Sequence, residues 1–161
     1  MKFQNVVQRH FQGEFSVKPS LVDTDTLSFF FKRHPSVVSS FEAYSQQYGR
    51  VNLSIITYYE ILSGLKHRDA NKKLEVFLDF AAQNTILSLT EEAATIASEH
   101  YATLCKQGQP LEDIDLLIAG IALSNNLVLV THNTKHFERI EGLEIADWTL
   151  DFQKRTENVE R

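Results

Sequence analysis

The feature that most constrains this chain is an alternation between short apolar segments and longer segments with helical spacing. The short segments are rich in β-branched residues, which favour strands. Strands that are separated by helices favour parallel pairing, because the chain must cross back over the sheet. The pattern therefore predicts an α/β fold, with a mostly parallel central sheet and helices on both faces. The expected strands are 20–23, 51–56, 85–89, 127–131 and a weaker one at 143–145, in the order βααβααβααββ.

Local patterns place helix starts directly after the strands. Asp23, Thr24 and Asp25 are each suitable N-caps for a helix over 24–32. Thr57 and Glu60 follow the second strand with the spacing of a capping box, so a helix is expected to begin there. Further helices are expected at 36–47, at 74–82, from 90 to before Gly108, and at 116–123.

Length and patterning indicate one domain. The chain has 161 residues, of which 43% are hydrophobic, enough for a single packed core and too few for two ordinary ones. The alternation of strands and helices occupies residues 20–149. Residues 1–19 form an N-terminal extension and residues 150–161 a charged C-terminal tail, and we expect both to be peripheral.

The charge balance narrows the kind of partner. Asp and Glu number 21 against 16 for Lys and Arg, which gives a formal charge of −5. A broad surface that grips duplex DNA by neutralising phosphates is therefore disfavoured. An acidic chain can still act on nucleic acid through a local site, which often contains a metal ion.

Cysteine content and hydropathy bear on the compartment. Cys105 is the only cysteine, so no intramolecular disulfide can form, which fits a reducing cytoplasm. No apolar run reaches the roughly 18 residues needed to span a bilayer, and the first fifteen residues lack the apolar stretch of a signal peptide. We therefore expect a cytoplasmic protein without a membrane segment.

Polar residues that follow the strands are the candidates for chemistry, because ligands of open parallel sheets bind at the carboxyl ends of the strands. Asp23 follows the first strand, Glu60 the second, and Thr131 and Asn133 the fourth. Carboxylates that gather at one edge repel one another unless a cation such as Mg²⁺ or Mn²⁺ lies between them. Such a metal ion suits phosphodiester hydrolysis.

A second acidic pair opens the apolar segment 116–123, which is too apolar for a surface helix. Asp113 and Asp115 lie where negative charge meets the positive end of the helix dipole. This helix precedes the fourth strand, so its start can lie at either edge of the sheet. Each acid also has a plain structural role open to it: Asp23 as a cap, Glu60 as a capping-box partner and Asp115 as compensation for the dipole.

Three other features have mainly structural interpretations. His132 and His136 lack the helical Glu that would support a zinc site, so solvent-facing or RNA-facing histidines are favoured. The basic stretch 66–68, together with Lys72 and Lys73, is typical of a solvent-exposed helix face. The alternative is that these residues contact phosphate. Aromatic pairs and triplets are more often core or dimer contacts than platforms for bases.

Four segments together resemble the motifs of the PIN-domain ribonucleases, and most closely those of the VapC toxins of bacterial toxin–antitoxin pairs. The family motifs are L-D-T-N, S-x-I-T-x-x-E-L-x-x-G, G-x-P-x-G-x-x-D-x-x-I-A and a closing L-V-T-N-N segment that ends in Trp. Their counterparts here are residues 21–25, 54–64, 108–119 and 129–148, in the same order and with the same spacing. The resemblance covers roughly residues 20–149.

The resemblance implies a single PIN-like domain over residues 20–149 with Mg²⁺-dependent endoribonuclease activity, in which Mn²⁺ can substitute. Asp23, Glu60 and Asp115 occupy the family's acidic, catalytic positions, with Asp23 and Asp115 as metal ligands. The supporting residues are Thr24, Asp25, Asp113, Thr131 and Asn133. The implied partners are a VapB-type antitoxin, an RNA substrate and a second copy of the chain. The best candidate for the RNA is a tRNA, cut at a single-stranded loop.

The sequence departs from the family pattern at several positions. Asn133 stands where many PIN domains have Asp, although the branch that cleaves initiator tRNA also has Asn there. Asp25 takes the place of an Asn, and Asp113 and Glu112 replace the usual Pro and Gly, respectively. A weakened acidic set leaves open a catalytically weak PIN fold that binds RNA or a protein.

A different enzyme class is suggested by the Asp23-x-Asp25 spacing, which looks like the start of haloacid-dehalogenase-type phosphatases. That class also needs a Lys and a late acidic pair, which the segment after the fourth strand does not supply. The phosphatase hypothesis leaves Glu60 without a role, and it remains a remote alternative.

Overall fold

The computed structural model describes residues 17–150, so most of the proposed N-terminal extension and of the charged tail lies outside the described residues. Five parallel strands form one sheet in the order β3-β2-β1-β4-β5. The predicted mostly parallel sheet is therefore confirmed. The strands are β1 (Ser20–Val22), β2 (Asn52–Ser54), β3 (Thr85–Leu87), β4 (Val128–Val130) and β5 (Ile145–Ala146).

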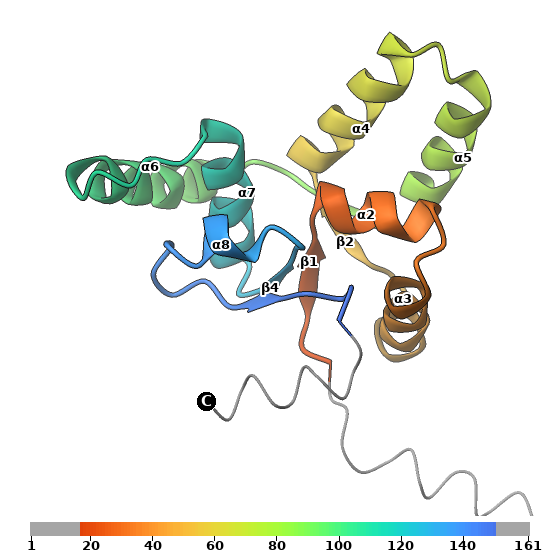
Figure 1. Cartoon of the computed structure of the whole chain (residues 1–161), viewed down its shortest axis with the longest axis horizontal. Coiled ribbons are helices and arrows are strands. Elements are labelled where there is room, and N and C mark those ends of the chain that lie inside the picture. Colours follow the sequence, from red (N-terminus) through yellow and green to blue (C-terminus); the bar gives the residue numbers. More distant parts are fainter. Residues whose placement is uncertain (1–16, 151–161) are drawn as a thin grey trace, which may run out of the picture.

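Seven helices in the described part of the chain connect these strands (Figure 1). Two helices follow each of the first three strands before the next strand begins, as the sequence predicts. The short helix α8 between β4 and β5 was not predicted. The helices are α2 (Thr24–Phe31), α3 (Pro35–Tyr48), α4 (Ile55–His67), α5 (Asn71–Ala82), α6 (Glu91–Lys106), α7 (Asp113–Ser124) and α8 (Thr134–Phe137).

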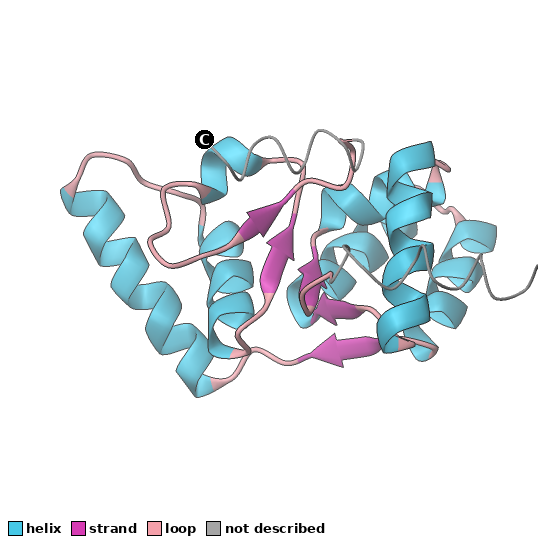
Figure 2. Ribbon diagram, turned by 90° about the horizontal axis from the view of Figure 1, so that it is seen from below, coloured by secondary structure: helices cyan, strands magenta, loops and turns pink. Residues whose placement is uncertain are grey.

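The sheet buries side chains on both faces, because successive residues of a strand point to opposite sides. In β1, Leu21 packs in a cluster with residues of α6 and α7, whereas Val22 packs in a second cluster with residues of α2 and α3. In β4, Leu129 and Val130 divide between the same two clusters. Figure 2 shows the strands between the two sets of helices. The predicted coverage of both faces is confirmed.

The predicted capping box at Thr57 is wrong. Helix α4 begins at Ile55, and its N-cap is Ser54, whose hydroxyl accepts a hydrogen bond from the backbone N–H of Thr57 at 2.9 Å. Ser54 and Thr57 compete for the same role, and the hydroxyl nearer the end of β2 caps the helix. Glu60 therefore lies within α4 and is free for another role.

The chain after β4 also differs from the prediction. Residues 134–137 form α8, and a turn with a positive φ of 81° at Gly142 follows. The last strand therefore covers Ile145–Ala146 instead of 143–145. By contrast, α7 is buried along most of its length, as its apolar sequence predicts. No helix within residues 17–150 is long and apolar enough to cross a bilayer.

Helices α6 and α7 cross at very short distance because of one glycine. A Cβ atom at Gly120 would lie 2.3 Å from the carbonyl oxygen of Ala93 and 3.2 Å from the Cβ of Ala97. Only a residue without a side chain permits this approach. Since α7 leads into β4 and contains Asp115, the crossing also sets the position of that acid.

We expect Gly120→Ala to lower the melting temperature, because forcing α6 and α7 apart costs about 1–3 kcal/mol. Gly64→Ala is the matched control: Gly64 lies within α4 with nothing within 4 Å of the added atom, so alanine should stabilise the helix by about 0.5–1 kcal/mol. Thermal unfolding followed by circular dichroism measures both changes. Equal shifts for the two variants would contradict the close crossing.

Candidate active site

The candidate site lies at the carboxyl ends of β1 and β4. From β1 the chain moves outward to β2 and β3, and then returns across the sheet to β4 on the other side of β1. Neighbouring strands whose connections run in opposite directions leave a crevice at their carboxyl ends, where open α/β sheets bind ligands. Asp23 directly follows β1, and Thr131 directly follows β4.

Asp23 is a buried carboxylate, only 7% exposed. It is the N-cap of α2: its Oδ1 accepts a hydrogen bond from the backbone N–H of Thr24 at 2.8 Å. Its Oδ2 accepts a hydrogen bond from the Thr131 hydroxyl at 2.9 Å. Burial, reinforced by the negative charge of Asp25, raises the pKa of Asp23 to about 7, although both hydrogen bonds oppose the shift. Asp23 forms no ion pair with a basic side chain within residues 17–150.

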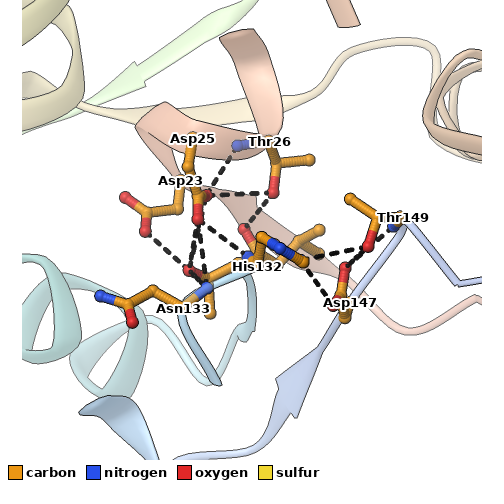
Figure 3. A network of polar contacts seen from close by, with 9 residues as sticks. Asp23, Asp25, Thr26, His132, Asn133, Asp147 and Thr149 are labelled. Carbon is orange, nitrogen blue, oxygen red and sulfur yellow. Dashed lines mark hydrogen bonds and ion pairs between the residues drawn. The ribbon is translucent and has the colours of Figure 1, made fainter. Parts of the chain in front are cut away.

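Asp25 ties the start of α2 to the loop after β4. Its Oδ2 accepts hydrogen bonds from the backbone N–H groups of His132 at 3.0 Å and Asn133 at 3.1 Å. Its Oδ1 accepts a third from the backbone N–H of Thr26 at 2.6 Å. Figure 3 shows this carboxylate between the two segments. The carboxyl group suits this position because both of its oxygens accept hydrogen bonds here, whereas the amide of the family's Asn has one acceptor oxygen.

Glu60 reaches the site from α4. The hydroxyl of Thr24 donates a hydrogen bond to its Oε1 at 2.7 Å, and the Thr57 hydroxyl lies 3.0 Å from that of Thr24. Thr24 therefore contacts Asp23 through its backbone and Glu60 through its side chain. This contact replaces the capping-box role that the sequence also allowed for Glu60.

Asp115 approaches from the first turn of α7. Its Oδ2 lies 3.4 Å from Nδ1 of His136 in α8, a long contact, and the same Nδ1 lies 2.9 Å from Nδ2 of Asn133. Burial raises the pKa of Asp115, while His136 opposes the shift; the charges of Glu112 and Asp25 act in the same direction as burial. The start of α7 therefore lies at the edge of the sheet where the strands have their carboxyl ends, near Asn133.

Most of the predicted site residues come together. Asp113 does not: it is exposed, and no contact joins it to the other acids within the described residues. Residues two apart on a helix point in widely different directions, so Asp113 and Asp115 cannot face the same site. The predicted residues that the structure gathers are Asp23, Thr24, Asp25, Glu60, Asp115, Thr131 and Asn133.

The two histidines after β4 have separate carboxylate partners, which sequence reasoning missed. His132 Nδ1 lies 3.0 Å from Oδ2 of Asp147, and His136 contacts Asp115 (Figure 3 shows the first pair). Each ring therefore contacts a different carboxylate. The pairing of His136 with Asn133 and Asp115 depends on α8, which places residues 133 and 136 on one face. A prediction of that short helix would have been needed to find it.

The donor chemistry of the site fits a divalent cation such as Mg²⁺. Its oxygens come from half-buried and buried carboxylates. Burial raises the pKa of both Asp23 and Asp115, and a divalent cation beside them would favour their ionised forms. Within residues 17–150, no three side chains of His, Cys, Asp or Glu lie close enough together to ligate one ion as they stand. The contact with His136 turns the Asp115 carboxylate toward α8.

Comparison with known proteins shows which family this chain and its fold match. Residues 20–143 match the PIN domain family. The chain is 33% identical to the tRNA(fMet)-specific endonuclease VapC of Shigella flexneri over 80% of this chain and 97% of the relative, and 31% identical to Ribonuclease VapC1 of Haemophilus influenzae strain R2866 over 80% and 97%. Among solved structures, DNA-bound VapBC from Salmonella typhimurium has a TM-score of 0.73 at 32% identity, covering 82% of this chain and 99% of the other. VapBC-1 from nontypeable Haemophilus influenzae has a TM-score of 0.69 at 32% identity, covering 81% and 98%.

The raised pKa of Asp23 predicts a pH-dependent stability of the metal-free protein. The ordinary pKa is 3.8 and the folded-state value about 7, so between these values the folded protein holds a proton that the unfolded chain has lost. The contribution of Asp23 to stability therefore falls as pH rises through this window, and it is constant above it. Asp23→Asn removes this dependence.

We measure the melting temperature of Asp23→Asn minus that of the parent, in EDTA at pH 4.5 and at pH 8. We expect this difference to rise by at least about 5 °C between the two pH values, because each kcal/mol of stability shifts the melting temperature by a few degrees. Asp79→Asn, at an exposed acid on α5, is the control and should follow the parent at both pH values. A constant difference between Asp23→Asn and the parent would mean that Asp23 is ionised throughout.

Proposed function

This chain belongs to the PIN-domain family, and on that premise we propose that it is a Mg²⁺-dependent endoribonuclease acting as the VapC-type toxin of a toxin–antitoxin pair. The observation that carries the proposal is the arrival of Asp23, Glu60 and Asp115 at one sheet edge from three different elements. Three independent helix caps would have no reason to meet there, whereas a hydrolytic metal site requires it.

We assign the metal ion to Asp23 and Asp115, with Mn²⁺ as a substitute for Mg²⁺. When bound, such an ion supplies a Lewis acid for the phosphate and lowers the pKa of a water molecule. The Thr131 hydroxyl and the Thr24 N–H fix the orientation of the Asp23 carboxylate. The Thr24 hydroxyl fixes Glu60, which is then available to accept a proton from an attacking water molecule.

The substrate we propose is a tRNA, cut at a single-stranded loop. Relatives of this chain carry the name tRNA(fMet)-specific endonuclease, and Asn133 matches the branch that cleaves initiator tRNA. With a net charge of −5, the protein lacks the broad basic surface that sequence-independent RNA binding would need. Recognition of a folded RNA, with unstacked nucleotides presented at a loop, fits this charge. A toxin with this substrate acts in the cytoplasm.

The partner we propose is a VapB-type antitoxin, since the structural relatives are VapBC complexes. An Arg or Lys from its arm, placed among the acids, would balance their charge and block the metal site. A homodimer stays a prediction. Exposed apolar side chains such as Ile55, Tyr59 and Tyr101 are candidates for contacts with either partner.

The alternative of a catalytically weak PIN fold rests on Asn133. Its amide contributes no charge, and its Nδ2 atom contacts His136. The remaining acids are nonetheless in place, so we favour the enzyme. The phosphatase hypothesis has no support in the family match. It would also need Asp25 as a general acid/base, whereas the Oδ2 atom of Asp25 accepts two backbone hydrogen bonds.

Cleavage of purified initiator tRNA tests the activity. We expect Mg²⁺ or Mn²⁺ to support cleavage and EDTA to stop it. Asp115→Asn should lower the rate by on the order of 100-fold or more, because it removes a charge from the metal site. Asp113→Asn is the matched control: the same change, two residues away on α7, at an exposed side chain outside the site. Full activity in Asp115→Asn, or undiminished cleavage after thorough chelation, would rule out the proposed metal site.

Growth tests the toxin role. Expression of the chain alone should arrest growth, and expression of Asp115→Asn should not, because arrest depends on cleavage. Co-expression of a cognate antitoxin should restore growth of cells with the parent protein. If cells grow equally well with and without the antitoxin, the protein is not a toxin, whatever its activity in the test tube.

A further inference from the structure

His132 distinguishes this chain from the family pattern at the rim of the acidic site. It stands where the closing L-V-T-N-N segment of the family has its first Asn. Thr131, the residue before it, donates a hydrogen bond to Asp23, and the backbone N–H of His132 donates one to Asp25. The side chain of His132 is 54% exposed. Its ring is therefore a solvent-accessible polar group beside the acids.

Three side chains hold the ring of His132 in one orientation. Its Nδ1 lies 3.0 Å from Oδ2 of Asp147 and 3.2 Å from the hydroxyl oxygen of Thr149 (Figure 3). Phe29 of α2 packs edge to face with the ring, with 5.4 Å between the ring centroids and 84° between the ring planes. Contacts from α2 and from the segment after β5 thus restrict a side chain that its exposure alone would leave free to rotate.

Asp147 is itself fixed. It directly follows β5, precedes the buried Trp148, and has a side chain that is only 11% exposed. Its Oδ1 accepts hydrogen bonds from the backbone N–H and from the hydroxyl of Thr149, at 2.9 and 2.7 Å. Its Oδ2 faces His132, so Asp147 is a positioning residue for the imidazole ring.

These contacts decide which ring nitrogen carries the proton. A carboxylate can only accept hydrogen bonds, and the Thr149 hydroxyl already donates its proton to Asp147, so both oxygens near Nδ1 are acceptors. Nδ1 is therefore the protonated nitrogen, as in other histidines that a carboxylate orients. Nε2 of the neutral ring is then an acceptor, and no hydrogen bond within residues 17–150 uses it.

The charges around the ring disfavour a phosphate at Nε2. Asp147 contacts the ring and Asp25 contacts the backbone of His132, while no Lys or Arg contacts these three residues in the described part of the chain. A phosphate would be repelled here, whereas a neutral group that donates a hydrogen bond would be accepted. The ribose 2′-hydroxyl of RNA is such a group, and DNA lacks it.

We propose that Nε2 of His132 accepts a hydrogen bond from the 2′-hydroxyl of a ribose next to the scissile phosphate, so that His132 helps to select RNA over DNA. The inference rests on the proposed ribonuclease function and adds a specificity-determining residue to it. A 2′-hydroxyl accompanies the backbone at every nucleotide, so a strand with one phosphate at the acids brings one to His132. The hydroxyl takes no part in bond making or breaking, because water is the proposed nucleophile.

The test removes single 2′-hydroxyls from the substrate. The cut in initiator tRNA is mapped, and tRNAs are then assembled with one 2′-deoxy or 2′-fluoro nucleotide at each position around it. Neither group can donate a hydrogen bond. The parent is compared with His132→Asn, whose shorter side chain keeps an amide near Asp147 but has no atom where Nε2 lies. His100→Asn, at a half-buried histidine of α6 outside the site, is the matched control.

In the parent and in His100→Asn, we expect the loss of one particular 2′-hydroxyl to lower kcat/KM by about three- to tenfold, as for a single neutral hydrogen bond. In His132→Asn, the same change at that position should alter kcat/KM by less than about twofold. A purely structural role of His132 would lower the cleavage of all substrates alike. The dependence on one position therefore isolates the contact.

The role of Asp147 has a separate readout. Nitrogen-15 NMR of the His132 ring at pH 8 should show the proton on Nδ1 in the parent. In Asp147→Asn, Oδ1 can keep its bonds to Thr149 while the amide N–H faces Nδ1 as a donor, so the proton should move to Nε2. A proton on Nε2 in the parent would overturn the proposal.

The contact is also overturned if the parent and His132→Asn show equal effects of 2′-deoxy substitution at every position. If His132→Asn weakens the cleavage of all substrates alike and lowers the salt dependence of binding, the ring contacts a phosphate and the proposal is wrong. The proposed function fails in a different way. The parent then does not cleave unmodified tRNA with Mg²⁺, or one 2′-deoxy nucleotide abolishes cleavage by every variant because that hydroxyl is the nucleophile.

Discussion

The buried carboxylate of Asp23 is the group on which the rest of the site depends. Burial makes its ionisation costly, and only two hydrogen bonds, from the Thr24 N–H and the Thr131 hydroxyl, offset that cost. The result is a pKa near neutrality, which leaves the acid ready to exchange its proton for a cation. Its position is fixed by backbone: its N–H donates to the carbonyl of Val130, so β1 and β4 hold it between them.

Two neighbours of Asp23, Thr24 and Asp25, connect the start of α2 to other elements of the site. Asp25 holds the loop after β4 against α2, which positions Asn133 for its contact with the histidine of α8. The Thr24 hydroxyl donates a hydrogen bond to Glu60. Both residues also line the cavity between α2, α4 and α5, whose lining includes basic side chains. Negative and positive charge thus occupy adjoining regions of one surface.

Much of the site could be predicted because its residues are marked locally. Asp23 follows an apolar strand and caps a helix, and Glu60 lies in a motif whose spacing is specific. The errors arose where two local patterns competed or where an element was very short. Ser54 and Thr57 both satisfy a capping pattern, and only the end of β2 decides between them. Helix α8 has four residues, too few for a periodic pattern, so the partner of Asp115 was missed.

The sequence by itself determined the alternation of strands and helices, the burial of α7 and the acids that follow the strands, because these depend on periodicity and on neighbours along the chain. Tertiary structure decided the strand order, with β1 between β2 and β4, and hence that Asp23 and Thr131 meet where the chain reverses direction across the sheet. It also decided that Asp115 faces the site while Asp113 does not, and that Lys32 joins the basic residues of α4 and α5. These arrangements follow from how the faces of helices and strands bury apolar surface against one another, which no local pattern records.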